Sequence, residues 1–177
     1  NVRDMKLSYL HNKIGYIPQK AIMFKGTIKE NITFGNSSFK KTNEEKIEEA
    51  IKVAQAYEFV EKMPDKYNSM ISQGGTNISG GQKQRLSIAR AIARNPEIYI
   101  FDDSFSALDY KTDYLLRKEL KKYTKDATIF IVAQRIGTIK DADKIIVLDN
   151  GKCVGIGSHD ELMKKCSVYK EIALSQV

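Results

Sequence analysis

Ser79, Gly80 and Gly81 stand directly before a helical pattern that continues to Arg94. Glycines let a backbone approach a ligand closely, and the free N–H groups at the start of a helix favour a phosphate. The same three residues can also form an ordinary glycine-rich helix cap. Taken alone, this stretch leaves both interpretations open.

Asp102 and Asp103 follow an apolar run, Ile98 to Phe101, which begins shortly after Pro96. A short apolar run with such borders is typical of a buried parallel strand. Ligands of α/β proteins bind at the carboxyl ends of such strands, so Asp102 can hold Mg²⁺ and Asp103 can polarise a water molecule. A turn or a helix cap after the strand is the alternative.

Three further polar sites accompany the two aspartates. The sequence Ser106-Ala107-Leu108-Asp109 follows closely, and Asp109 can belong to a site or merely cap a helix. Gln19 follows an earlier strand and can contact Mg²⁺ or water, or be an ordinary loop residue. Gln134 ends a second apolar run, and we expect it at the same edge of the sheet as Asp102.

The hydrophobic pattern predicts the elements that position these residues. Strands are expected at 14–17, 98–101 and 128–133, the last two buried. Helices are expected at 43–63, 79–94 and 109–123, with a helical turn at 27–32 and a polar loop at 65–76. Thr42 or Asn43 can cap the helix at 43–63. Helices that alternate with buried strands predict an α/β fold with a mostly parallel sheet.

The last third of the chain contains two local signals. Asn150-Gly151 lies between apolar runs at 144–148 and 152–156, which predicts a β-hairpin. Ser158 and Glu161 form a capping box that begins the first of two short helices over 158–175.

The composition narrows the class of protein. The chain has 177 residues, 42% of them hydrophobic, which suits one packed domain, and no apolar run approaches the ~20 residues of a membrane helix. Its net charge of +7 is mixed with acidic residues rather than gathered in blocks, which argues against nucleic-acid binding. Cys153 and Cys166 lack metal-site spacing, so free thiols in a reducing cytoplasm are expected.

Together the motifs resemble those of ABC transporter nucleotide-binding domains. Asn77 to Ala91 (NISGGQKQRLSIARA) is similar to the signature motif and its helix, Ile98 to Asp102 to Walker B, and Ser106 to Asp109 to the D-loop. Gln19 falls in the Q-loop, and Gln134 falls where the switch histidine is expected. The order and separations agree over nearly the whole chain.

The resemblance is closest to exporters, through Phe24 to Ile32 and the tail Gly155 to Leu162, in which His159 is expected to be structural. It implies a P-loop NTPase (RecA-like) core with a mostly parallel sheet and an ABC-specific helical subdomain. The helical subdomain is expected at about 27–94, and residues 1–26 and 95–177 are expected to be parts of the ATPase core.

The resemblance also implies cofactors and roles for individual residues. ATP and Mg²⁺ are the expected cofactors, with Asp102 and Gln19 at the metal and Asp103 and Gln134 in hydrolysis. A second nucleotide-binding domain and the transmembrane domains of an exporter, at the cytoplasmic face of the membrane, are the expected partners. The partner's ATP is expected to contact Ser79, Gly80, Gly81 and Gln82. Residues 23–25 and 72–76 are expected to face the transmembrane domains.

Two departures from the family pattern fall in the hydrolytic residues. Asp103 stands where glutamate is usual, and its side chain is one methylene shorter. Gln134 replaces the switch histidine; it can hydrogen-bond a phosphate but has no titrating proton. Both changes together predict a slowly hydrolysing site in one half of a heterodimeric exporter. The signature, altered only by Ile78 for leucine, is expected to serve the partner's site.

A third departure is that the chain contains no Gly-x-x-x-x-Gly-Lys-Ser/Thr motif. The chain is therefore expected to start downstream of the P-loop and its strand, to bind ATP weakly on its own and not to hydrolyse it. Two other functions stay open: a nucleotide-gated clamp with little hydrolysis, and a soluble ABC ATPase outside transport. The latter would need coiled-coil or tandem-domain features, which the sequence lacks.

Overall fold

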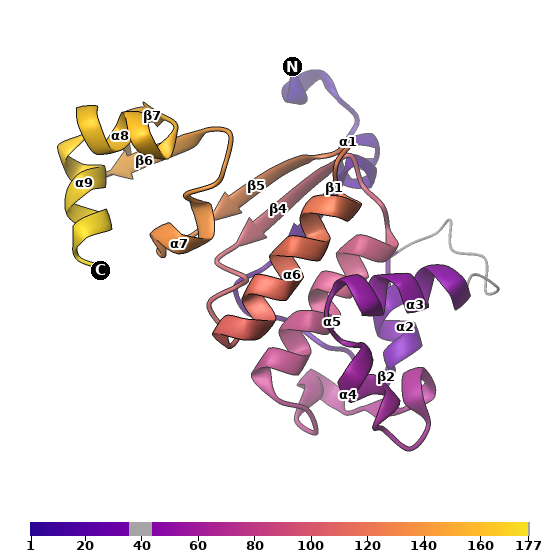
Figure 1. Cartoon of the computed structure of the whole chain (residues 1–177). Helices are drawn as coiled ribbons and strands as arrows, with labels where there is room; N and C mark the ends of the chain where they lie inside the picture. The colour runs from indigo at the N-terminus through magenta and orange to yellow at the C-terminus, as the bar shows by residue number, and fades with distance from the viewer. Residues whose placement is uncertain (36–43, 177) are drawn as a thin grey trace. The chain divides into compact units, whose positions relative to one another are not determined.

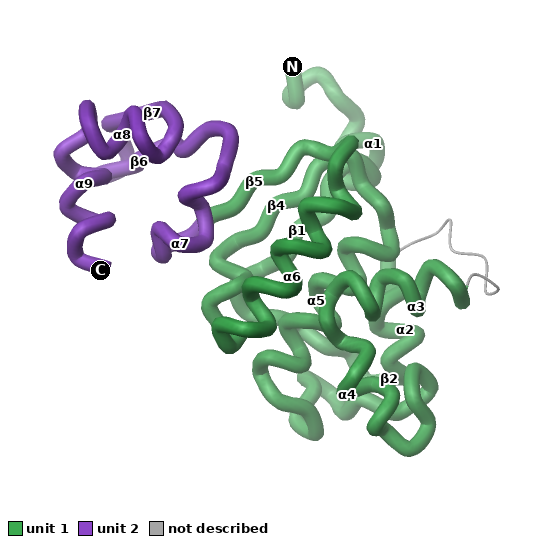
Figure 2. The backbone as a smooth tube through the Cα atoms, in the orientation of Figure 1, with its two compact units in different colours: residues 1–132 green, residues 133–177 purple. Residues whose placement is uncertain are grey.

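The computed structural model describes residues 1–35 and 44–176, which form two compact units divided between Val132 and Ala133 (Figure 2). The predicted cap at Thr42 or Asn43 lies outside the described residues. The predicted division into a helical subdomain at about 27–94 and an ATPase core has other boundaries than these two units, and it stays a prediction.

The first unit contains helices and strands in mixed order (Figure 1). Its helices are α1 (Leu7–Lys13), α2 (Ile28–Thr33), α3 (Glu44–Val53), α4 (Tyr57–Glu61), α5 (Gly80–Ala93) and α6 (Tyr110–Tyr123). Its strands are β1 (Ile14–Ile17), β2 (Gly26–Thr27), β3 (Met70–Ile71), β4 (Ile98–Asp102) and β5 (Thr128–Val132). Short 3₁₀ helices cover Val2–Asp4, Lys66–Asn68 and Gln73–Gly75.

The predicted α/β fold with a parallel sheet is confirmed. β1, β4 and β5 form a parallel sheet in which β4 is central, and Ile100 aligns with Tyr16 on one side and Phe130 on the other. Side chains alternate between the two faces of a strand, so Tyr99 and Phe101 share the buried face. Helices α5 and α6 cover this face, because their buried residues belong to the same core cluster.

The expected burial of the run at 128–133 is wrong. Its strand, β5, forms as predicted, but Phe130 is 52% exposed and Val132 is 55% exposed. β5 lies at an edge of the described sheet, and both side chains point away from the face that α5 and α6 cover. The apolar run therefore forms an exposed face, which also includes Tyr16.

The single helix predicted at 43–63 is also wrong, because it is broken into α3 and α4. Gln55 has a left-handed backbone, with φ of 55°. The Ala56 amide donates to Ile51 O at 2.8 Å and the Gln55 amide to Lys52 O at 3.0 Å, which is the Schellman pattern of a helix end. Arg85 of α5 fixes the break, since its Nη1 donates to Gln55 O at 2.7 Å.

The stretch expected to be a polar loop, 65–76, contains short structure. β3 pairs with β2 in antiparallel fashion, with Gly26 opposite Ile71. The 3₁₀ helix that follows is tied to the chain after β1, because the Gly74 amide donates to Met23 O at 3.1 Å. Tertiary pairing thus orders a segment whose local sequence favours only turns.

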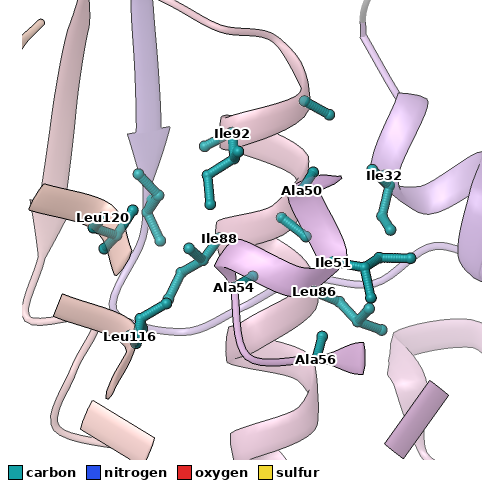
Figure 3. Packing of buried hydrophobic residues seen from close by; sticks show 14 of the residues in the cluster. Ile32, Ala50, Ile51, Ala54, Ala56, Leu86, Ile88, Ile92, Leu116 and Leu120 are labelled. Carbon is teal, nitrogen blue, oxygen red and sulfur yellow. The ribbon is translucent and has the colours of Figure 1, made fainter. Parts of the chain in front are cut away.

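The core of the first unit lies on both sides of α5. Figure 3 shows α6, with Leu116 and Leu120, on one side of this helix, α2 with Ile32 on the other side, and α3 crossing α5 between them. Leu116 and Ile88 are both 0% exposed, and burying each such side chain stabilises the fold by about 1.5–3 kcal/mol. The helix that carries the Ser-Gly-Gly sequence is therefore firmly held along its length.

The second unit contains α7 (Ile136–Ile139), β6 (Ile145–Asp149), β7 (Lys152–Gly157), α8 (His159–Lys165) and α9 (Ser167–Leu174). The predicted hairpin is confirmed as β6 and β7, with positive φ at Asn150 and Gly151. The capping box of Ser158 and Glu161 is also confirmed at the start of α8. Both cysteines are free thiols, and His159 contacts Tyr169 OH at 2.9 Å through Nδ1, as a structural residue would.

Candidate functional site

The start of α5 is held by its own side chains. The Ser79 hydroxyl accepts from the Gln82 amide at 3.2 Å, and the Gln82 side chain accepts from the Ser79 amide at 2.8 Å. These two bonds form a capping box. The Ser79 hydroxyl still has its own proton to donate, and the first-turn amides of Gly80 and Gly81 have no acceptor within the helix.

The two glycines differ in their surroundings. A Cβ at Gly80 would meet nothing within 4 Å, so the backbone there is open to a ligand. A Cβ at Gly81 would lie 3.5 Å from Ala107 O and 4.0 Å from Leu108 Cδ2. The signature sequence and the sequence 106–109 therefore pack against each other, although they are far apart along the chain.

Asp102 ends β4 and meets a residue that the sequence analysis did not single out. Tyr16 OH donates to Asp102 Oδ2 at 2.8 Å, and this bond raises the pKa of the Tyr16 phenol. β1 and β4 are neighbours, and both side chains lie on the exposed face of the sheet. The alternation within 14–17 is the only sequence signal for this contact, and it becomes useful only once the strand pairing is known.

Asp103 lies beside Gln19, because the neighbouring strands β1 and β4 end at the same edge of the sheet. Gln19 Nε2 donates to Asp103 Oδ2 at 3.0 Å, which leaves Gln19 Oε1 outside that bond. The Asp103 backbone is left-handed, with φ of 44°, and its amide donates to Val132 O at 2.9 Å. Ser106 Oγ donates to Asp103 O at 2.8 Å, so the turn after β4 is fixed on two sides.

Asp109 is the N-cap of α6. Its Oδ2 accepts from Thr112 Oγ1 at 2.7 Å and its Oδ1 from the Thr112 amide at 2.9 Å. The bond from the Thr112 hydroxyl, and to a smaller extent the bond from the Thr112 amide, lower the pKa of the Asp109 carboxyl. The capping alternative thus describes what Asp109 does in this structure, and a further role for residues 106–109 stays a prediction.

Gln134 belongs to the second unit, and its backbone is held there by Gln176. Gln176 Nε2 donates to Gln134 O at 2.8 Å, and the Ile136 amide donates to Gln176 Oε1 at 2.8 Å. The side-chain amide of Gln176 thus bonds to the backbone at both Gln134 and Ile136. Its expected place at the same sheet edge as Asp102 stays a prediction.

Comparisons with known proteins identify relatives of this chain. The family model described as ABC transporter matches residues 1–106. An uncharacterised ABC transporter ATP-binding protein of Mycobacterium tuberculosis is 44% identical over 176 residues, 99% of this chain and 30% of the relative. A putative multidrug export ATP-binding/permease protein of Bacillus subtilis is 41% identical over 172 residues, 97% of this chain and 29% of the relative.

A solved structure of a bacterial Atm1-family ABC exporter with ATP bound matches with a TM-score of 0.89 and 32% sequence identity. The match covers 96% of this chain and 29% of the exporter chain. The chain belongs to the ABC transporter family. Its fold is the P-loop NTPase fold of an exporter's nucleotide-binding domain.

The chain spans about 30% of the length of the curated relatives described above. Within residues 1–35 and 44–176, every helix is too short or too polar to cross a membrane. In the same part of the chain, His, Cys, Asp and Glu side chains form no group of three or more that could hold a metal ion.

Proposed function

We propose that this chain is an ATP-binding part of an ABC exporter whose own site hydrolyses ATP slowly and whose signature completes the ATP site of a second nucleotide-binding domain. Export would follow from ATP binding and hydrolysis at the interface of the two domains. The family match and the exporter-like relatives support the exporter part of this proposal.

The residues at the end of β4 suit a magnesium ion that a nucleotide brings with it. Mg²⁺ usually keeps several waters and is bound by one or two carboxylates together with substrate phosphates. Asp102 offers a carboxylate and Gln19 an amide oxygen at the same sheet edge, where Gln19 hydrogen-bonds the next residue, Asp103. When bound, Mg²⁺ would neutralise charge on the phosphates.

The observation that carries the slow-site proposal is the contact between Asp103 and Gln19. Asp103 is one methylene shorter than glutamate, and the 3.0 Å bond from Gln19 Nε2 holds its carboxylate close to the sheet. A displacement of ~1 Å of a reacting group can lower a rate by ~100-fold. Gln134 adds to the effect, because it can donate a hydrogen bond but cannot exchange a proton.

The opposite expectation applies to the start of α5. The Ser79 hydroxyl proton and the Gly80 and Gly81 amides point out of a helix N-terminus, where a phosphate is favoured. These groups would meet the γ-phosphate of ATP held by the partner domain. The contact between Gly81 and Ala107 links them to residues 106–109.

Single-turnover hydrolysis by the full transporter tests the proposal. Asp103→Glu together with Gln134→His should raise the rate of hydrolysis at this chain's own site by about tenfold or more. The glutamate carboxylate would reach farther toward the attacking water, and the histidine could exchange a proton. Asp126→Glu, the same change at an exposed aspartate, is the control.

A rate that stays the same in the double variant would contradict the slow-site proposal. Such a result would favour the clamp instead, in which this site holds nucleotide with little hydrolysis. If the wild-type transporter shows no ATP-dependent transport, the exporter proposal itself is contradicted.

A further inference from the structure

Arg90 of α5 is a largely buried cation. Among the described residues it bonds to carbonyl and amide oxygens and to the Met23 sulfur rather than to a carboxylate. Its Nε donates to Asn31 O at 2.7 Å, its Nη1 to Ile22 O at 3.1 Å and its Nη2 to Asn31 Oδ1 at 3.2 Å. Burial lowers the pKa of its guanidinium. The planar fork of arginine fits such a set of acceptors, and lysine does not reproduce it.

Asn31 uses its whole side chain in the same cluster. It is 2% exposed. Its Oδ1 also accepts from the Phe24 amide at 2.9 Å, and its Nδ2 donates to Phe24 O at 2.9 Å and to Thr27 O at 3.0 Å. The backbone of Phe24 is therefore held on both its N–H and its C=O by one side chain, which Arg90 in turn holds in place.

The cluster reaches the surface through two aromatic rings. Phe24 and Phe34 stack with their centroids 4.1 Å apart, and the Arg90 guanidinium lies 5.5 Å and 6.0 Å from the two centroids. Phe24 is 37% exposed and Phe34 is 53% exposed. Arg90 thus connects the signature helix to the exposed apolar side chains of Ile22, Phe24 and Phe34.

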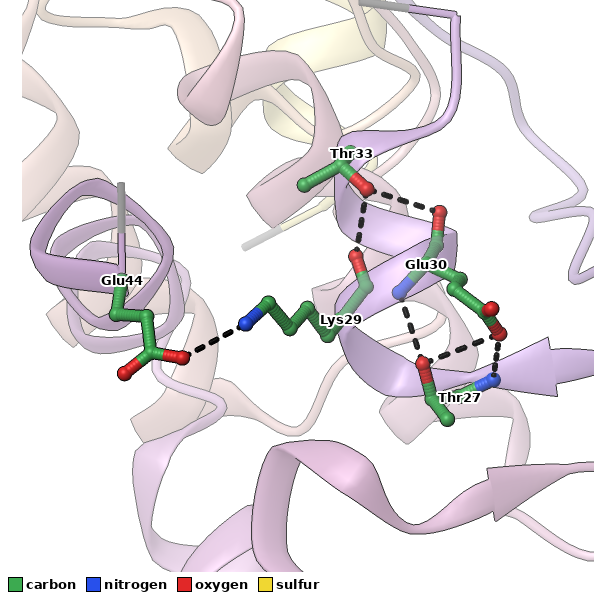
Figure 4. Close-up of polar contacts among 5 residues, drawn as sticks. All are labelled: Thr27, Lys29, Glu30, Thr33 and Glu44. Carbon is green, nitrogen blue, oxygen red and sulfur yellow. Dashed lines mark hydrogen bonds and ion pairs between the residues drawn. The ribbon is translucent and has the colours of Figure 1, made fainter. Parts of the chain in front are cut away.

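Helix α2 does not depend on Arg90 alone. Figure 4 shows the capping box of Thr27 and Glu30 at its start and the ion pair between Lys29 and Glu44 of α3, with Nζ and Oε1 2.7 Å apart. Ile28 and Ile32 are 0% exposed in the core. Weakening Arg90 should therefore loosen residues 22–25 while α2 stays folded.

We propose that Arg90 is a positioning residue that links the signature helix to residues 22–25, so that nucleotide bound at the start of α5 changes the position of the surface that meets the transmembrane domains. This inference rests on the proposed function. Arg90 would act through Asn31 and the backbone of Phe24, and it would touch neither nucleotide nor transported substrate.

The test compares Arg90→Lys with Arg94→Lys in the full transporter. Arg94 lies at the end of the same helix and donates to a single carbonyl, His11 O, at 2.9 Å. Arg90→Lys should lower the substrate moved per ATP hydrolysed by about tenfold, which corresponds to a lost coupling of about 1.4 kcal/mol, while basal hydrolysis stays near the wild-type rate. Arg94→Lys should change neither quantity.

Hydrogen exchange at the Phe24 amide is the second measurement. ATP should change the exchange rate of this amide in the wild type and in Arg94→Lys, and not in Arg90→Lys. Equal behaviour of the two variants would overturn the proposal, as would a parallel loss of basal hydrolysis and transport in Arg90→Lys.

Asn31→Asp provides the same comparison if Arg90→Lys is not recovered as folded protein. It keeps the shape of the side chain and removes the Nδ2 donor to Phe24 O, so coupling and exchange should change in the same direction; wild-type values for both would overturn the proposal. If the wild-type transporter moves no substrate, the exporter proposal fails, and the ATP-dependent exchange of the Phe24 amide decides the role of Arg90 by itself.

Discussion

The phenol of Tyr16 occupies one oxygen of the carboxylate that the family pattern places at the metal. With Tyr16 OH and Asp102 Oδ2 2.8 Å apart, the second oxygen, Oδ1, is directed away from this bond. Groups that orient a metal-binding carboxylate commonly change metal affinity by about 10–100-fold when removed. The effect of Tyr16 should therefore appear in the dependence of ATP binding on the Mg²⁺ concentration.

Tyr16→Phe in the full transporter should raise the Mg²⁺ concentration needed for half-maximal ATP binding by about tenfold, because Asp102 loses its orienting donor. Calorimetric titration of ATP binding at varied Mg²⁺ measures this shift. Tyr114→Phe is the matched control, since Tyr114 and Tyr16 are each 55% exposed. A midpoint that is the same in both variants would contradict an orienting role for Tyr16.

At the scale of elements, the segment before the signature is fastened to the chain after β1. The Gly74 amide donates to Met23 O, and Asn77 Nδ2 donates to Met70 O at 2.9 Å. Gly74 and Gly75 both have left-handed backbones, with φ of 69° and 67°. A Cβ at Gly75 would lie 3.1 Å from the flexible end of Lys83, at Cε, and 3.2 Å from Met23 Cβ and Cγ, whereas one at Gly74 would meet nothing within 4 Å.

Alanine at Gly74 and at Gly75 should therefore have unequal effects on the free energy of unfolding. Gly74→Ala should destabilise the chain by about 1 kcal/mol through backbone strain alone. Gly75→Ala should cost about 2–4 kcal/mol, because crowding against Met23 is added to the same strain. Urea unfolding measures both, and equal losses would show that Met23 yields without cost.

Sequence reasoning succeeded where the signal is local. Asp109 caps α6, Asn150-Gly151 turns the hairpin, and Ser158 starts α8, because a few neighbouring residues decide each of these features. The bond between Gln19 and Asp103 was not predicted, because it depends on the pairing of β1 with β4. The chemical roles of these site residues remain predictions.

The features that sequence reasoning missed depend on partners far along the chain. The break after α3 has no glycine or proline to announce it, and Arg85, thirty positions after Gln55, holds its carbonyl. Tyr16 meets Asp102 only through strand pairing. The exposure of Phe130 could not be predicted either. An apolar run indicates a strand that is suited to burial, but it does not identify which element packs against the strand.

At the scale of the whole molecule, the sheet presents an apolar face. Tyr16, Phe130 and Val132 are exposed by 52–55% and share this face with the half-buried Ile98 and Ile100. Soluble proteins rarely leave contiguous apolar patches open, and those that do tend to associate through them. An edge strand beside such a face adds unpaired backbone groups.

The 177-residue chain on its own should therefore self-associate, and Phe130→Gln with Val132→Thr should weaken the association. Sedimentation velocity over a range of concentrations measures the effect. Leu174→Gln, at a 57% exposed apolar residue of α9, is the control. If the control weakens association as much as the double variant, the face formed by Phe130 and Val132 is not the cause.

The left-handed backbone at Asp103 has a consequence for how such a site evolves. Aspartate and asparagine adopt this conformation more easily than other residues with a Cβ, because their short polar side chains bond locally. Aspartate at position 103 therefore strains the backbone less than glutamate would, although its side chain is shorter. Where a second ATP site hydrolyses the nucleotide, selection for the longer glutamate would be weak, and a return to glutamate would cost conformational energy.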